Sequence, residues 1–389
     1  MKPSANWPTI ILIWFFGIMA GASLGKVIPV IGAIIGAMGV TPDQAAWMIS
    51  LVTLVSVLIA PFGGWLIEQI GDRQVVLAGA IAGILGNFGA VGSHSFAPLI
   101  AARIVESVGF TGLVLGGTAM MIRVTSGPRR NNAMALWATG VPVGLGVSEG
   151  LASLWTHGEW QAPFIIHGIF LVAAAVAVKF LPAWQAADST APKPGILAIY
   201  HYAATLRLGF ALTCLVVCQF GADTIFPTYL LAAHGQAVAI AGTIGGVASL
   251  CTIFGSNGSG ILLNRDWTPV TIAIWAICLG ALGCAGTFFP GGGIVSSSIA
   301  LCLCNFGAGL GIGLGFAIIA DLTPGHAFHP AAGSLCNQLV NLGFVLGAPL
   351  AFAALKMQIS AGPMVLAAIM GVMGLLLLPM ASLRLAKHQ

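Results

Sequence analysis

The chain has 389 residues, of which 58% are hydrophobic and only 6% carry a formal charge. Because an ordinary soluble domain is about a quarter charged, this composition excludes a water-soluble globular protein. The formal net charge of +4 comes from basic residues that fall in loops, so it gives no indication of a nucleic-acid partner.

Apolar runs follow one another along almost the whole chain, and each is long enough to cross a bilayer core, which takes about 20 residues. The first half is predicted to form helices over residues 8–36, 43–67, 75–92, 97–122, 131–153 and 161–181. The second half is predicted to form helices over residues 206–231, 238–262, 269–289, 294–320, 331–355 and 362–383. We expect the run from Trp7 to be retained as a span, since it continues past the small residues Ala20 and Ala22 of a possible signal-peptide cleavage site.

These runs predict an all-α membrane protein with twelve transmembrane helices in two pseudo-symmetric six-helix bundles. The bundles cover residues 1–182 and 206–389, and a polar cytoplasmic linker over residues 183–205 joins them. The protein is expected in the bacterial inner membrane, as a monomer in the lipid bilayer.

The basic residues predict the topology. With both termini in the cytoplasm, Lys356 lies outside, Lys26 and Arg103 lie within helices, and the other lysines and arginines fall on the inner side, as the positive-inside rule requires. Those cytoplasmic residues are Lys2, Arg73, Arg123, Arg129, Arg130, Lys179, Lys193, Arg207, Arg265, Arg384 and Lys387. All eight cysteines lie between Cys214 and Cys336 within predicted helices, so we expect free, buried thiols.

The two halves repeat a pattern. The first helix carries Lys26 and Pro29, and the seventh carries Asp223 and Pro227 at nearly the same depth. Halves related in this way are typical of transporters that bind a substrate near the bilayer midplane.

The motifs resemble those of the major facilitator superfamily across essentially the whole chain. The loop after the second helix is similar to the family signature at Gly64, Glu68 and Gly71, followed by Asp72 and Arg73, although Asp72 stands where a basic residue is usual. The fourth and fifth helices also carry family-like motifs, at Arg103, Gly109, Gly112 and Gly116, and at Gly140, Pro142, Gly144 and Gly146. The cation in the first helix is similar to that of the cyanate and nitroimidazole transporter group.

This resemblance implies that helices 1, 4, 7 and 10 line a central cavity and that access to it alternates between the two sides of the membrane. We also expect a conformational latch in the loop after the second helix, because a carboxylate there would meet the positive end of the dipole of the eleventh helix. The latch residues are Gly64, Glu68, Gly71, Asp72 and Arg73, with Glu68 near the start of the eleventh helix.

Few ionisable residues lie within the predicted spans, where a charge costs about 2.5 to 3.5 kcal/mol. Arg103 and Glu106 are three residues apart and can therefore pair on one helical face. One interpretation is a structural ion pair. The other is a proton relay with Glu149, because a carboxylate changes its proton affinity when its cationic partner is exchanged.

A second set of polar residues is expected to bind the substrate. Lys26 has two possible roles. In the first, its ammonium is unpaired and binds the substrate anion. In the second, Lys26 pairs with Asp223 and holds the two halves closed. Asp223 could instead be a helix-end carboxylate in periplasmic water. Further uncharged candidates, which could equally be contacts between helices, are Gln219, Asn257, Asn305 and Asn337.

Glycines recur every fourth residue at Gly307, Gly311 and Gly315, and this spacing indicates either close helix packing or a hinge.

The sequence therefore predicts proton-coupled transport of a small organic or inorganic anion, driven by a proton gradient. The alternative is a proton-coupled exporter of drugs or metabolites. A receptor or an embedded enzyme is not expected, because no Ser/His or metal-ligand constellation lies at a common depth, and no cofactor is expected either.

Overall fold

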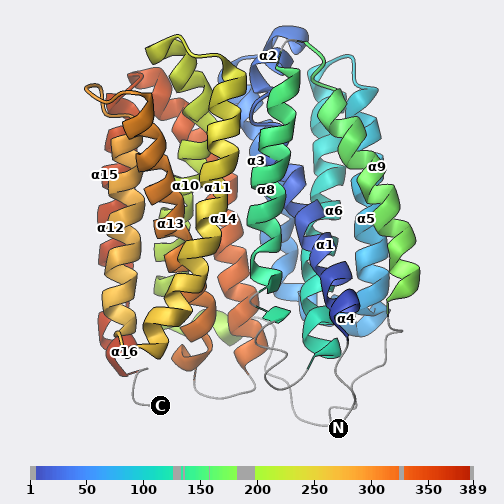
Figure 1. Ribbon diagram of the computed structural model, residues 1–389. Coiled ribbons are helices and arrows are strands. Elements are labelled where there is room, and N and C mark those ends of the chain that lie inside the picture. The colour runs from blue at the N-terminus through green and yellow to red at the C-terminus, as the bar shows by residue number, and fades with distance from the viewer. Residues whose placement is uncertain are drawn as a thin grey trace. The chain divides into compact units, whose positions relative to one another are not determined.

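The computed structural model describes residues 6–125, 133–134, 136–156, 158–181, 198–323 and 328–385, and these residues form helices joined by short turns (Figure 1). They divide into two compact units. The first contains residues up to Thr41 and from Leu51 to Thr190, and the second contains Pro42–Ser50 and the residues from Ala191 onward. Residues 182–197 lie outside the described part, so the predicted bundle and linker boundaries remain predictions.

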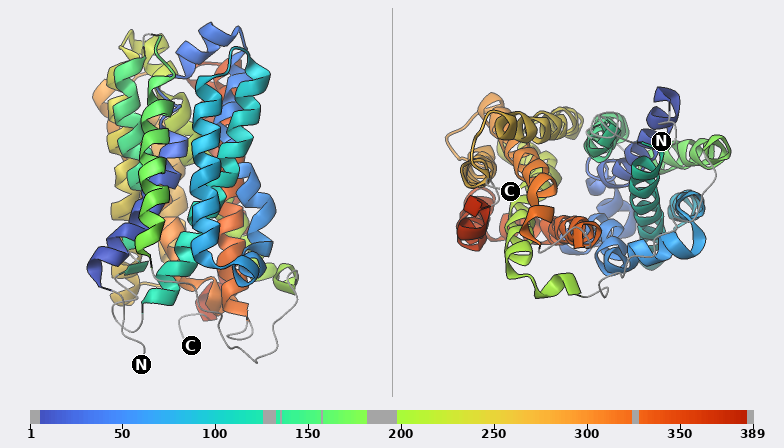
Figure 2. Two further views of the ribbon diagram at one scale, coloured as in Figure 1. Left: turned by 90° about the vertical axis from the view of Figure 1, so that its right-hand side faces the viewer. Right: turned by 90° about the horizontal axis from the view of Figure 1, so that it is seen from below.

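The first unit is built from eight described helices. They are α1 (Trp7–Gly25), α2 (Ile31–Met38), α3 (Pro42–Ile59), α4 (Gly63–Ile70), α5 (Asp72–Val91), α6 (Phe96–Val124), α8 (Gly140–Ala152) and α9 (Ala162–Ala177), although the first residues of α3 group with the second unit. Helices α5 and α6 run side by side through this unit (Figure 2).

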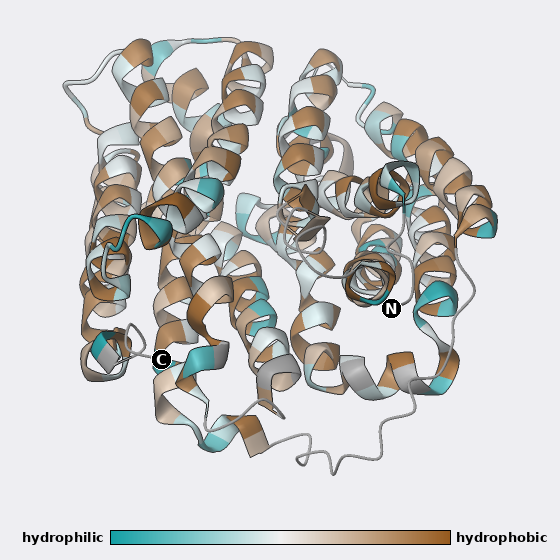
Figure 3. Ribbon diagram, turned by 60° about the horizontal axis from the view of Figure 1, so that its bottom comes forward, coloured by the Kyte–Doolittle hydropathy of each residue, from teal (hydrophilic) through white to brown (hydrophobic). Residues whose placement is uncertain are grey.

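The second unit consists mainly of longer helices. They are α10 (Ala203–His234), α11 (Val238–Asn264), α12 (Pro269–Thr287), α13 (Ile294–Ile318), α14 (His329–Met357), α15 (Ala361–Leu377) and the short α16 (Met380–Leu385). Hydrophobic residues run along the helices of both units (Figure 3).

Ten helices in the described part of the chain are long and apolar enough to cross a membrane, and α15 is a shorter apolar helix. The structure therefore confirms an all-helical, multi-pass membrane protein. The fifth predicted helix is described mainly as α8, because residues 126–132 and 135 lie outside the described part.

The first predicted helix is not continuous, which corrects the prediction of one helix over residues 8–36. Helix α1 ends at Gly25, Lys26 caps it, and a turn over residues 26–30 separates it from α2. Pro29 explains the break, because proline has no backbone N–H and disfavours helical geometry in the residue before it. Tighter bonds replace the helical ladder there, from Ile28 N to Gly25 O (3.2 Å) and from Val30 N to Val27 O (3.2 Å).

Two other predicted helices are divided at prolines. A 3₁₀ turn containing Pro61 separates α3 from α4. Helix α15 ends before the extended Leu378, which precedes Pro379, and α16 follows. The predictions of unbroken helices over residues 43–67 and 362–383 were therefore wrong at these points.

Glycines allow the helices to approach one another closely. A Cβ atom at Gly25 would lie 2.1 Å from the backbone oxygen of Leu145 in α8, and one at Gly144 would lie 2.0 Å from that of Ile18 in α1. In the second unit, a Cβ atom at Gly307 of α13, the first glycine of the repeat, would lie 2.5 Å from the backbone nitrogen of Gly280 in α12. Backbone contact of this kind supports the packing interpretation of the glycine repeats.

All eight cysteines are free, as predicted. Cys251, Cys278 and Cys302 are only partly buried within the protein, which corrects the expectation that every thiol is buried.

Candidate transport site

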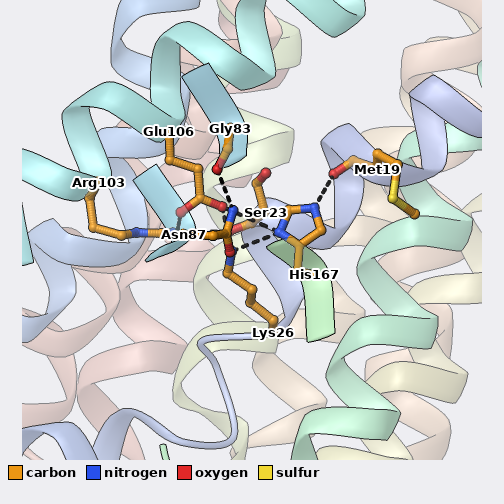
Figure 4. Close-up of polar contacts among 8 residues, drawn as sticks. All are labelled: Met19, Ser23, Lys26, Gly83, Asn87, Arg103, Glu106 and His167. Carbon is orange, nitrogen blue, oxygen red and sulfur yellow. Dashed lines mark hydrogen bonds and ion pairs between the residues drawn. The ribbon is translucent and has the colours of Figure 1, made fainter. Parts of the chain in front are cut away.

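A cluster of polar side chains lies inside the first unit, where four helices meet (Figure 4). It contains Lys26 at the end of α1, Asn87 of α5, Arg103 and Glu106 of α6, and His167 of α9. These side chains are at most 4% exposed, so the cluster is shielded by the protein itself.

The Lys26 ammonium contacts three acceptors. It donates to Asn87 Oδ1 at 2.5 Å, to His167 Nδ1 at 2.8 Å and to Glu106 Oε1. An ammonium group has three N–H donors, so this arrangement uses all of them. The Phe164 ring lies 4.5 Å from the same nitrogen and adds a cation–π contact.

Glu106 joins the two cations of the cluster. Its Oε1 accepts from Lys26 and its Oε2 accepts from Arg103 Nη1. Arg103 also donates from Nη2 to Ser23 O at 3.0 Å, which is one of the carbonyls left without an intrahelical donor where α1 ends. The break in α1 thus supplies both a cation and an acceptor to the cluster.

The contacts of His167 define its tautomer. Its Nε2 lies 2.9 Å from Met19 O, which can only accept, so the Nε2 hydrogen points to that carbonyl. Its Nδ1 therefore accepts from Lys26, and the imidazole is neutral in this arrangement. Nδ1 also lies 3.6 Å from Glu106 Oε1, the oxygen that Lys26 occupies.

Glycines of α5 bring these residues together. A Cβ atom at Gly86 would lie 2.7 Å from the Glu106 backbone nitrogen, so only glycine permits this approach of α5 to α6. The Gly83 carbonyl accepts from Asn87 Nδ2 at 2.8 Å, which aims the Asn87 oxygen at Lys26. Local packing thus determines the geometry of the cluster.

A second polar cluster lies inside the second unit. The Asp223 carboxylate of α10 accepts from Gln219 Nε2 at 2.6 Å and from Asn305 Nδ2 of α13 at 2.8 Å. Thr252 of α11 donates to Asn305 Oδ1 at 3.2 Å. Asp223 is fully buried, and its carboxylate pairs with no lysine or arginine of the described residues.

The structure confirms the predicted contact between Arg103 and Glu106. Lys26 is not unpaired, and its partner is Glu106 of the same unit, which neither interpretation of Lys26 had included. The idea that Asp223 is a helix-end carboxylate in water is also wrong, because Asp223 is buried within α10. Glu149 is buried on α8.

Of the predicted amide residues, Gln219 and Asn305 contact Asp223. The described hydrogen bonds of Asn257 and Asn337 are instead within their own helices. Asn257 is exposed and donates to Ile253 O at 2.9 Å within its own helix. The backbone oxygen of Asn337 accepts from Asn341 at 2.8 Å.

Three cluster members were missed in the sequence. Asn87, His167 and Thr252 are polar residues within apolar runs, which is a detectable signal. His167 was overlooked because it carries no formal charge at neutral pH.

The loop after the second predicted helix contacts other parts of the first unit. Gly71 has φ +84°, which favours glycine, and the buried Asp72 binds Arg123 at the end of α6 with an Nε–Oδ2 distance of 2.6 Å. Arg73 donates to Lys179 O at 3.3 Å. Gly64 lies in α4, and the Glu68 side chain lies outside the described part, so the latch remains a prediction.

Helices of membrane-spanning length that enclose buried charged and polar clusters are typical of membrane transporters. The family model of the Major Facilitator Superfamily matches residues 13–348, and the chain belongs to this family of secondary transporters. A solved structure of the nucleoside transporter NupG, determined on a point mutant, has the same fold, with a TM-score of 0.74 over 97% of this chain and 99% of that one, at 12% identity.

Two curated relatives match part of the chain. The riboflavin transporter RibZ of Clostridioides difficile (strain 630) is 26% identical over 182 residues, which cover 46% of this chain and 39% of RibZ. The quinolone resistance protein NorA of Staphylococcus aureus (strain MRSA252) is 20% identical over 167 residues, which cover 43% of each protein. The chain thus spans about two fifths of the length of these relatives.

Proposed function

We propose that the protein transports a small organic or inorganic anion together with protons, by alternating access across the bacterial inner membrane with both termini in the cytoplasm. The observation that supports this proposal is the charge of the first cluster. Its contacts join two cations, Lys26 and Arg103, to one carboxylate, Glu106. A cation at this depth is unusual in a membrane-spanning protein, and the Lys26 ammonium can hold a substrate anion by a charge-assisted contact.

The proposed proton-coupling residues are Arg103, Glu106 and Glu149. Glu106 holds both cations, so any change in its partners alters its own proton affinity and that of the groups around it. Proton movement and substrate binding are thereby linked through one carboxylate.

Asp223, Gln219 and Asn305 are proposed to supply the substrate contacts of the second unit, with Asn257 and Asn337 as further polar groups. A closer relationship to the cyanate and nitroimidazole transporters rests on the cation at Lys26 alone. Cyanate and small monocarboxylates are therefore the first anions to test.

Proteoliposomes with an acidic exterior and a pH-sensitive dye inside test the proposal. External anion should enter with protons and acidify the interior faster than in protein-free vesicles. If none of the anions moves protons and lipophilic cations do, the proposal is wrong.

Binding measurements address Lys26 directly. Lys26→Met leaves the Arg103–Glu106 pair balanced, so the variant should fold but lose at least about tenfold in anion affinity, as expected for a charge-assisted bond of about 1.5 to 3 kcal/mol. Lys179→Met is the matched control, because Lys179 is exposed. Parental affinity in Lys26→Met would show that Lys26 is a structural cation.

The second candidate is a proton-coupled exporter of drugs or metabolites. It is supported by the similarity to the quinolone resistance protein NorA and by Asp223, a buried carboxylate that could exchange a proton for a cationic substrate. Efflux of lipophilic cations from vesicles, lost in Asp223→Asn and retained in Lys26→Met, would favour this function.

A further inference from the structure

We propose that His167 is the proton-coupling switch of the first unit: protonated His167 replaces Lys26 on Glu106 and releases the Lys26 ammonium to the substrate anion. This inference rests on the proposed anion transport and deepens it. It gives a role to a buried residue that contacts both Lys26 and Glu106 and that the proposed relay does not include.

The problem to be solved is that Lys26 has no N–H donor left for a substrate. Its three donors are directed at Asn87, Glu106 and His167. An anion can bind this ammonium only after at least one of these contacts opens. The switch must therefore act on the acceptors of Lys26.

His167 is placed to compete with Lys26. Its Nδ1 accepts from Lys26 at 2.8 Å and lies 3.6 Å from Glu106 Oε1. When a proton supplied from the acidic side of the membrane adds to Nδ1, that nitrogen becomes a donor and can no longer accept from the ammonium. The imidazolium then repels Lys26 and can donate to Glu106 Oε1, so two contacts of Lys26 open together.

The groups that face His167 identify the acceptor for a protonated Nδ1. The other cation of the cluster is Arg103, which remains bound to Glu106 through Nη1 and to Ser23 O through Nη2. Asn87 of α5 is neutral, and Glu149 is the buried carboxylate of α8, a helix that packs against both α1 and α9. Glu106 is thus the carboxylate within reach of Nδ1 in the described contacts.

Lys26 also occupies a position from which it can move. It follows the last residue of α1, and the turn over residues 26–30 interrupts the helical ladder on its C-terminal side. A lysine within a continuous helix would have less freedom to redirect its side chain.

The charges balance in this exchange. Protonation adds one positive charge to the cluster, and a monovalent anion bound to Lys26 adds one negative charge. Lys26 keeps its own proton throughout. The expected stoichiometry is therefore one proton for each monovalent anion.

The first test compares anion binding by the parental protein and by His167→Asn in nanodiscs at about pH 4 and about pH 8, a window that is wider on its acid side than the usual titration of histidine. Asparagine retains an acceptor for Lys26 but takes up no proton. Parental affinity for small monocarboxylates or cyanate should be roughly tenfold higher at the lower pH, because binding is linked to proton uptake. His167→Asn should bind weakly at both pH values.

The matched control is His94→Asn, which makes the same substitution at an exposed residue of the same unit. It should keep the parental pH dependence. If His167→Asn keeps that dependence as well, the switch is wrong while the proposed anion transport stands.

A second measurement needs no substrate. Infrared difference spectra between the two pH values, with ¹⁵N-labelled histidine, should contain an imidazolium component that is missing from the spectrum of His167→Asn and present in that of His94→Asn. Loss of this component only in His167→Asn would support the switch even if no tested anion binds and the substrate class is wrong. An unchanged component in His167→Asn would overturn the switch.

Discussion

Glu106 is the residue on which the charge balance of the first cluster depends, since it is the carboxylate that contacts both Lys26 and Arg103. Glu106→Gln would leave two buried cations without that charge. We expect a loss of about 3 to 5 kcal/mol in stability, which is typical when one partner of a buried pair is removed. Thermal unfolding of the purified protein measures this loss.

Glu159→Gln provides the control for that experiment, because Glu159 is exposed. It should unfold at the parental temperature. A Glu106→Gln variant as stable as the parent would mean that the cations do not depend on this carboxylate.

Asp223 differs from Glu106 because its described partners are amides rather than cations. Asp223→Asn removes a costly buried charge and leaves no cation unpaired. We expect unchanged or higher thermal stability together with loss of transport in vesicles. A large loss of stability would instead assign Asp223 a structural role.

At the scale of helices, the contact between α1 and α8 depends on glycine. Gly144→Ala would place a Cβ atom 2.0 Å from Ile18 O, so the helices must separate. Overpacking of this kind costs about 1 to 3 kcal/mol, and thermal unfolding should show the loss.

Gly150 is a matched control on the same helix, because a Cβ atom there would meet nothing within 4 Å. Gly150→Ala should be neutral or stabilising, since alanine favours a helix by up to about 1 kcal/mol over glycine. Equal effects of the two substitutions would show that close packing of α1 on α8 is unimportant.

The sequence predicted where most helices lie, because apolar runs of spanning length leave the backbone few alternatives in a bilayer. It also predicted the contact between Arg103 and Glu106, since their spacing is local. It did not predict the break at Pro29, because prolines are tolerated in membrane helices when neighbouring groups satisfy the freed backbone. The partners of Lys26 were missed because Glu106 and His167 are distant in sequence and meet only through the packing of α1, α6 and α9.

At the scale of the whole molecule, the two units contain clusters of opposite character. The contacts of the first join two cations to one carboxylate, whereas those of the second surround a carboxylate with neutral groups. The sequence predicts a repeat of the two halves, but it did not predict this contrast, because the contrast depends on which side chains meet.

The proton and anion balance of the first cluster has an electrical consequence. A membrane potential changes the free energy of one elementary charge that crosses the bilayer by about 2.3 kcal/mol per 100 mV. If each monovalent anion crosses with one proton, loading the cluster leaves its charge unchanged, and the voltage does no net work on the substrate. Uptake into vesicles should then follow the pH difference and stay constant when a potassium ionophore sets the potential at different values. Uptake that rises or falls with the imposed potential would contradict one-to-one cotransport of anion and proton. A cell could therefore keep accumulating the anion after its membrane potential collapses, for as long as its interior remains more alkaline than its surroundings.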